Sequence, residues 1–120
     1  MHDRSVLDVE VVSELQDIMG QDFQMLVESF QRDGEQRLAA LDQAFAGGDA
    51  YTLRSQAHSF KGSSSNLGAI HVAGLCMELE TLASSGDLAN AAALIPSVTL
   101  AMCLSVRACL HLYPLQHASR

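Results

Sequence analysis

The chain has 120 residues, 48% of them hydrophobic and only two of them proline, which is typical of one globular domain covering residues 1–120. Its formal net charge of −7 opposes binding to nucleic acid or to an anionic membrane surface. A chain of this length can bury one core but hardly a cofactor as well, so we expect no cofactor.

The first expected helix is short and unusually apolar. It covers residues 9–19, with Ser5 or Asp8 as N-cap and Gly20 at its end. Its apolar positions exceed one buried stripe, and they are Val11, Val12, Leu15, Ile18 and Met19. Leu15, Ile18 and Met19, with Phe23 of the next helix, are therefore expected either to dock a partner or to cap the core.

The second expected helix is long, with Asp22 as N-cap and an end at Gly47 and Gly48. Apolar residues recur in it at three- and four-residue steps, as expected of a core-facing stripe. They are Phe23, Leu26, Val27, Phe30, Leu38, Leu41 and Phe45. Gly34 lies inside this helix, where glycine costs about 1 kcal/mol relative to alanine.

Two further helices follow in the middle of the chain. Asp49 is the predicted N-cap of the third, which should end in the polar turn 63–68. Its core face is Leu53, Ala57 and Phe60. The fourth is expected over residues 69–85, ending before Gly86, and its buried residues should be Val72, Leu75, Leu79 and Leu82.

The last segment carries a long apolar stripe, which predicts a fifth helix. The stripe consists of Leu88, Ala91, Ile95, Val98, Thr99, Met102, Val106, Cys109 and Tyr113. Pro96 must either kink this helix or mark its true start. Together the segments predict an all-α fold, an antiparallel four-helix bundle with an additional short N-terminal helix.

Apolar residues also occupy the other faces of this last segment. They are Leu94, Leu100, Ala101, Leu104, Ala108 and Leu112, and Arg107 is the only formal charge. Either Pro96 rotates the later residues so that both stripes face one core, or the helix supports weak self-association.

The stretch around His58 is the most informative part of the sequence. Leu53, Ala57 and Phe60 fall within about 60° on a helical wheel, and His58 lies more than about 90° from their centre. His58 is therefore expected on the exposed flank. One neutral ring nitrogen of histidine is nucleophilic near pH 7 while the other can be held by a hydrogen bond.

Three residues are predicted to complete the His58 site. Gly62 stands one turn after His58 and leaves room for a second protein to approach the ring. Lys61 can bring an ammonium toward a phosphoryl group on the ring. Glu80, which flanks the core stripe of the next helix, is the candidate partner of the second ring nitrogen. Each feature alone would suit an ordinary surface residue, but the combination favours a site.

The run AHSFKGSSSNLGA, residues 57–69, resembles the signature of histidine phosphotransfer domains. The resemblance extends to the acidic-Phe start of the second helix, to GGD before the third and to residues 76–80. It covers most of residues 8–86.

The resemblance implies phosphorylation of His58 on Nε2, charge support from Lys61, and approach of a receiver domain over Gly62. It also implies a hydrogen bond between Glu80 and Nδ1. The expected partners are receiver domains of hybrid sensor kinases and of response regulators. Where the family often has a further basic residue, this chain has Ser84 and Ser85.

Arg54, one turn before His58, is a substitute candidate for that missing cation. Kinase activity and nucleotide binding are not expected, because the bundle leaves no room for an ATP-binding domain and KGSSSNLG lacks the P-loop order. A protein adaptor that docks receivers without phosphotransfer is the alternative function.

Neither a metal site nor a membrane location is expected. His58, His71, Glu78 and Glu80 are potential ligands but form no Glu-x-x-His pair. Residues 1–10 lack the apolar core of a signal peptide, and residues 94–113 contain Pro96 and several polar groups, so a cytoplasmic protein is predicted. The odd count of cysteines, without a CxxC pair, predicts buried thiols at Cys76, Cys103 and Cys109.

Overall fold

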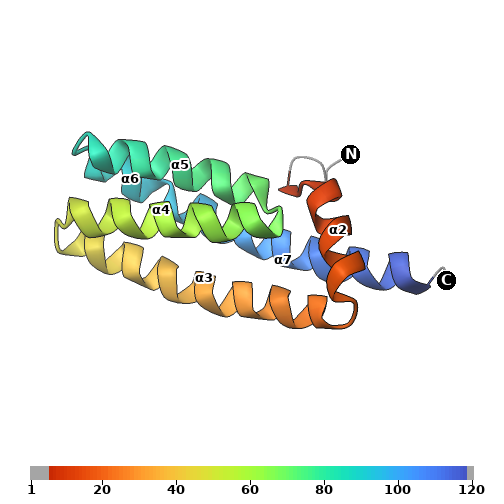
Figure 1. Ribbon diagram of the computed structural model, residues 1–120. Coiled ribbons are helices and arrows are strands. Elements are labelled where there is room, and N and C mark those ends of the chain that lie inside the picture. Colours follow the sequence, from red (N-terminus) through yellow and green to blue (C-terminus); the bar gives the residue numbers. More distant parts are fainter. Residues whose placement is uncertain (1–5, 119–120) are drawn as a thin grey trace.

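The computed structural model describes the backbone of residues 6–118 and the side chains of residues 6–111. Its helices are α2 (Val9–Met19), α3 (Asp22–Ala46), α4 (Ala50–Leu67), α5 (Ile70–Ser84), α6 (Leu88–Ala93) and α7 (Ile95–Ala118). Helices α3, α4, α5 and α7 lie lengthwise beside one another and alternate in direction, and the short α2 crosses the end of the bundle (Figure 1). The predicted four-helix bundle with a short additional N-terminal helix is confirmed.

The ends of α2 follow the local signals in the sequence. The carboxylate of Asp8 accepts hydrogen bonds from the amides of Glu10 and Val11, at 3.2 and 3.4 Å. Gly20 ends the helix with a φ of 56°. Capping chemistry therefore sets both boundaries of this helix.

The start of α3 and the end of α4 differ from the prediction. Asp22 lies inside the first turn of α3, because Gln21 already has helical dihedrals and takes the N-cap position. Helix α4 continues through the serine run to Leu67, since Ser64 and Leu67 are buried and the Ser63 hydroxyl donates to the Phe60 carbonyl at 3.2 Å.

The core lies between α3, α4, α5 and α7. Its largest fully buried side chains include Phe23, Phe60, Leu41, Leu53 and Leu79. Some residues predicted in the core lie outside it, because the adjacent residue in the helix faces the core instead. Phe45 is 43% exposed while Ala44 is buried, and Leu75 and Leu82 are only partly buried, because Cys76 and Ala83 face the core.

Close packing between helices explains why a glycine, Gly34, stands in the middle of α3. A Cβ at this position would collide with the sulfur of Met102 and approach the Phe60 ring to 3.2 Å. The glycine thus lets α3 lie close to α4 and α7, and this packing offsets its poor helix propensity.

Pro96 marks a helix start. Helix α6 ends at Ala93 and α7 begins at Ile95, so Pro96 stands in the first turn, where its missing amide is not needed. Most of the predicted stripe is buried, and Ala101 joins it, but Thr99 is exposed. Tyr113 and Leu112 lie outside the described side chains.

Two of the three thiols are buried as predicted. Burial raises the pKa of Cys76 and of Cys109 to about 12. Cys103 is exposed, so the prediction that it is a buried thiol is wrong; it lies on the outer face of α7, opposite the core stripe.

One apolar helical stretch among the described residues, Leu88–His111, meets the length and composition of a membrane span, with a mean hydropathy of 1.8. The turn at Leu94 divides it into two helices, and 39% of its most apolar window is buried inside the bundle. Core helices of soluble bundles share these properties, so the stretch alone does not indicate a membrane protein.

Candidate functional site

His58 projects from the outer flank of α4 toward α5. Its side chain is 63% exposed, as its position on the helical wheel predicts. The adjacent helix α5 brings Glu80 to the ring, and the distance from His58 Nδ1 to Glu80 Oε2 is 3.0 Å. The structure therefore brings together the two residues that the sequence analysis paired.

Glu80 also binds Lys61. The distance from Lys61 Nζ to Glu80 Oε1 is 3.2 Å, so one carboxylate bridges the histidine and the lysine. Partial burial raises the pKa of Glu80, but the hydrogen bonds from Lys61 and His58 and their charges outweigh it, and the net pKa is lowered. Glu80 is thus a carboxylate at neutral pH.

An ionised carboxylate can only accept hydrogen bonds, and this property fixes the tautomer of His58. Nδ1 must carry the proton that it donates to Glu80, which leaves Nε2 as the nitrogen with the free lone pair. Within residues 6–111, Nε2 has no hydrogen-bond partner. An exposed imidazole in this tautomer can act as a nucleophile through Nε2.

At Gly62 no side chain projects from the surface beside His58. A Cβ at this position would have no atom within 4 Å, so nothing inside the molecule requires glycine here. His58, Gly62 and Asn66 are spaced four residues apart and form one ridge of α4. The middle of this ridge has no side chain, and a second molecule can approach the backbone there.

Arg54 does not reach the ring in this structure. Its guanidinium lies over the ring of Tyr51, 5.4 Å from the centroid. Lys61 is therefore the cation that the described structure brings to the His58 and Glu80 pair.

An open groove of about 460 Å³ lies between α2, α3 and α4. Its apolar lining is Leu15, Met19, Leu26, Phe30 and Leu67, and its polar lining is Ser29, Asp33, Ser63 and Asn66. The surplus of apolar residues in the first helix predicted part of this lining. The contributions from α3 and α4 were missed, because they depend on how the helices are oriented.

The predicted docking residues separate into two groups. Ile18 is 80% exposed, and Leu15 and Met19 are partly buried at the groove. Phe23 is fully buried, so its prediction as a docking residue is wrong: its ring points into the core between the helices.

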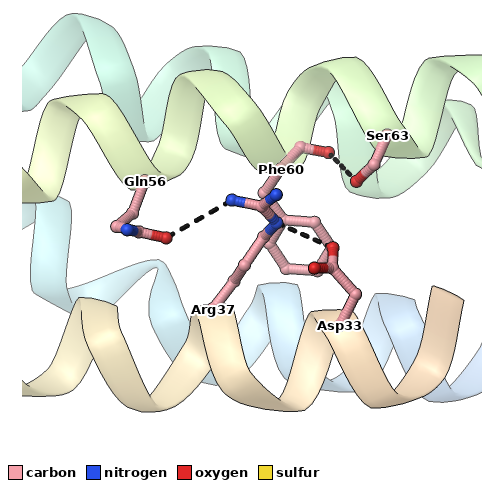
Figure 2. Close-up of polar contacts among 5 residues, drawn as sticks. All are labelled: Asp33, Arg37, Gln56, Phe60 and Ser63. Carbon is pink, nitrogen blue, oxygen red and sulfur yellow. Dashed lines mark hydrogen bonds and ion pairs between the residues drawn. The ribbon is translucent and has the colours of Figure 1, made fainter. Parts of the chain in front are cut away.

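One polar contact links α3 to α4 beside the groove, and a neighbouring ion pair within α3 orients the arginine that makes it. Arg37 Nε donates to the Asp33 carboxylate at 2.7 Å, and Arg37 Nη1 donates to Gln56 Oε1 at 3.4 Å. Figure 2 shows Arg37 reaching from α3 between these two partners, with the Ser63 to Phe60 bond nearby on α4. The Arg37 to Gln56 hydrogen bond is thus a polar contact between the two helices next to their apolar packing.

No group of three or more histidine, cysteine, aspartate or glutamate side chains that could hold a metal ion occurs in the part of the chain that the structure describes. His71 and Glu78 are exposed on α5, away from the contact that Glu80 makes with His58.

Comparisons with known proteins identify relatives of this chain. The family model of the Hpt domain matches residues 25–111, which include His58, Lys61, Gly62 and Glu80. Among solved structures, the chain is similar to the crystal structure of histidine-containing phosphotransfer protein B (HptB) from Pseudomonas aeruginosa PAO1. The TM-score is 0.83 and the identity 40%, covering 89% of this chain and 93% of the other. No curated protein matches the sequence.

Proposed function

This chain belongs to the Hpt domain family, and from that membership we propose that His58 is its phosphoryl acceptor. Members of this family are phosphotransfer intermediates rather than kinases, and they interact with receiver domains of two-component systems. In the proposed relay, His58 takes a phosphoryl group from a phospho-aspartate receiver domain of a hybrid sensor kinase. It then passes the group to the receiver domain of a response regulator.

In the proposed transfer, bonds form and break only at the histidine and at the phospho-aspartate. The lone pair of Nε2 attacks the phosphorus, the bond from phosphorus to the aspartate oxygen breaks, and the aspartate leaves as a carboxylate. The ring keeps its proton on Nδ1 and becomes positively charged. Glu80, 3.0 Å from Nδ1, stabilises that charge, and Lys61 is close enough to support the phosphoryl oxygens.

One observation carries the proposal: Glu80 Oε2 lies 3.0 Å from Nδ1 of an imidazole whose side chain is 63% exposed. An ionised Glu80 accepts a hydrogen bond from Nδ1 at this distance. This arrangement leaves Nε2 ready for attack without a further base. The bare backbone at Gly62 supports it, since a receiver must bring its aspartate within bonding distance of the ring.

We propose that the receiver docks over the groove between α2, α3 and α4. Leu15 and Met19 line this groove from α2, and Ile18 is exposed on the same helix. Apolar patches with a polar rim commonly bind proteins. Asn66 lines the groove and shares the ridge of His58 about 12 Å along α4, at 1.5 Å per residue. One receiver can therefore cover the groove and reach the histidine.

We propose that the protein is one cytoplasmic domain, residues 1–120, without kinase or nucleotide-binding activity of its own.

Incubating the protein with a receiver that carries a radiolabelled phosphoryl group tests the function. Acid-labile label should appear on the wild type and be absent from His58→Gln, which should keep its helicity because the side chain is outside the core. Acid-labile label on His58→Gln would refute His58 as the phosphoryl acceptor. A wild type that binds the receiver but takes up no label would favour the alternative function as an adaptor.

We also propose weak self-association through α7. Leu100 is 60% exposed and Leu104 is 37% exposed, although Ala101 faces the core. Sedimentation at micromolar concentration should detect a dimer that Leu104→Glu disrupts without loss of helicity. A strict monomer would refute this proposal and leave the phosphotransfer function untouched.

A further inference from the structure

Gln16 is a polar residue in an apolar place. It lies on the face of α2 that packs on the bundle, and its side chain is 1% exposed. Among the residues that the structure describes, neither its Nε2 nor its Oε1 has a hydrogen-bond partner. Burying an amide without hydrogen bonds is unfavourable, so Gln16 weakens the packing of α2 on the bundle.

Helix α2 is held on the bundle by the buried Val12, and its two ends are held differently. At its start, the Asp8 amide donates to the Gly68 carbonyl at 2.7 Å, and a Cβ at Gly68 would lie 3.2 Å from Val11. At its end, Gly20 has a φ of 56° and free space around it, and only Gln21 separates it from α3. The end at Gly20 is therefore the less constrained of the two.

The same helix forms one wall of the groove. Leu15 and Met19 line it from α2, and the opposite wall comes from α3 and α4. In Figure 1, α2 lies across the end of the bundle rather than along it, so a movement of α2 costs the burial of Val12 but is separate from the contacts that the four long helices make with one another.

We propose that α2 is a hinged flap that Gln16 keeps easy to open, and that a receiver domain docks to its open form. In the closed state the Gln16 amide is buried without a partner. In the open state water hydrates this amide, while Leu15 and Met19, which are partly buried in the closed state, become more exposed to the receiver. The inference rests on the proposed docking of a receiver at this groove, and it adds the way in which docking is regulated.

The variant Gln16→Met tests the flap, because methionine has a similar length and no amide. Amide hydrogen exchange of the full chain should show α2 opening more readily than α3, α4 and α5 in the wild type. In Gln16→Met the exchange of α2 should slow at least tenfold. Receiver binding should weaken by up to the same factor, since the competent state is populated less.

Ser64→Ala is the matched control. The Ser64 hydroxyl is also fully buried without a partner, but it lies in α4. Its replacement should leave the exchange of α2 relative to α3 and the receiver affinity unchanged. If Gln16→Met folds poorly, Gln16→Leu provides the same comparison.

The outcomes separate the flap from the function. Wild-type α2 that exchanges as slowly as α3, or exchange in Gln16→Met that is unchanged or faster, would overturn the flap. So would slower exchange with unaltered receiver affinity. If the wild type binds the receiver but takes no acid-labile phosphate from it, the phosphotransfer function fails, while the exchange of α2 and the receiver affinity still decide the flap.

Discussion

Gly34 and Gly62 both lie in the middle of a helix, in α3 and α4, and both cost the helix the same propensity. Gly34 is buried among other side chains, whereas Gly62 is exposed. At Gly34 a Cβ would meet Met102 and Phe60, so the interior of the protein requires glycine. At Gly62 a Cβ would meet nothing within 4 Å. A residue that folding does not require, beside an exposed histidine, points to a requirement from another molecule. The contrast separates positions that serve the fold from positions that serve the site.

The largest expected effect is on transfer by Gly62→Gln. A glutamine side chain would occupy the space through which the receiver reaches His58, so transfer should fall at least about 100-fold, equivalent to about 2.7 kcal/mol in the barrier. The free energy of unfolding should rise by up to about 1 kcal/mol because glycine is a poor helix former. Stopped-flow transfer and urea unfolding measure the two quantities. A stabilised variant with normal transfer would remove the distinction between the two glycines.

Gly34→Val should mainly affect stability. Overpacking against Met102 and Phe60 should exceed the small gain in helix propensity and lower the free energy of unfolding by about 2 kcal/mol. The matched Gly62→Val should change it by less than about 1 kcal/mol. Equal losses from both substitutions would contradict the packing explanation of Gly34.

Lys61→Ala should act on the site and spare the fold. Loss of the ammonium next to Glu80 removes one charge-assisted contact to the phosphoryl group, so transfer should slow or phosphohistidine lifetime shorten about tenfold, or about 1.4 kcal/mol. Lys61→Arg, which keeps the charge, should recover part of the loss. Unchanged rates and lifetimes in Lys61→Ala would assign Lys61 to the solvated surface.

The smallest expected effect is the pH dependence of stability at Glu80. Because the pKa of Glu80 is below its ordinary value of 4.5 in the folded state, its ionised form stabilises the fold above that value. This contribution is lost as the pH falls through the folded pKa. The free energy of unfolding of the wild type should therefore exceed that of Glu80→Gln by at most about 1 kcal/mol at pH 7. This difference in stability should shrink below pH 4.5. A constant difference from pH 3 to 7 would exclude this linkage.

Local signals predicted the helices better than their buried faces. Asp8, Gly20 and Asp49 act within one turn of themselves, and the helix ends that they predict are found. The end of α4 was predicted too early because serines favour turns, whereas Ser64 is held in the helix by burial against other helices. Burial of this kind depends on tertiary packing, which a single segment does not reveal.

The same distinction applies to the candidate site. The exposure of His58 follows from helical spacing, and Glu80 could be proposed from its place beside a core stripe. The bridge from Glu80 to Lys61 and the burial of Phe23 depend on the rotation of neighbouring helices about their axes. Exposed Cys103 was missed for a different reason, because its burial was predicted from the general habit of cysteine although it lies off the predicted apolar stripe.

The bridge between His58, Glu80 and Lys61 also limits the distance from which a receiver can distinguish the phosphorylated protein from the unphosphorylated one. With His58 in the neutral tautomer that the proposed transfer requires, the three groups of the bridge sum to no net charge, and on the proposed chemistry phosphorylation adds about one negative unit. Against a molecular charge of −7, the long-range field barely changes. Ionic strength should therefore alter receiver association similarly for both forms. A receiver can then tell a loaded histidine from an empty one only at contact.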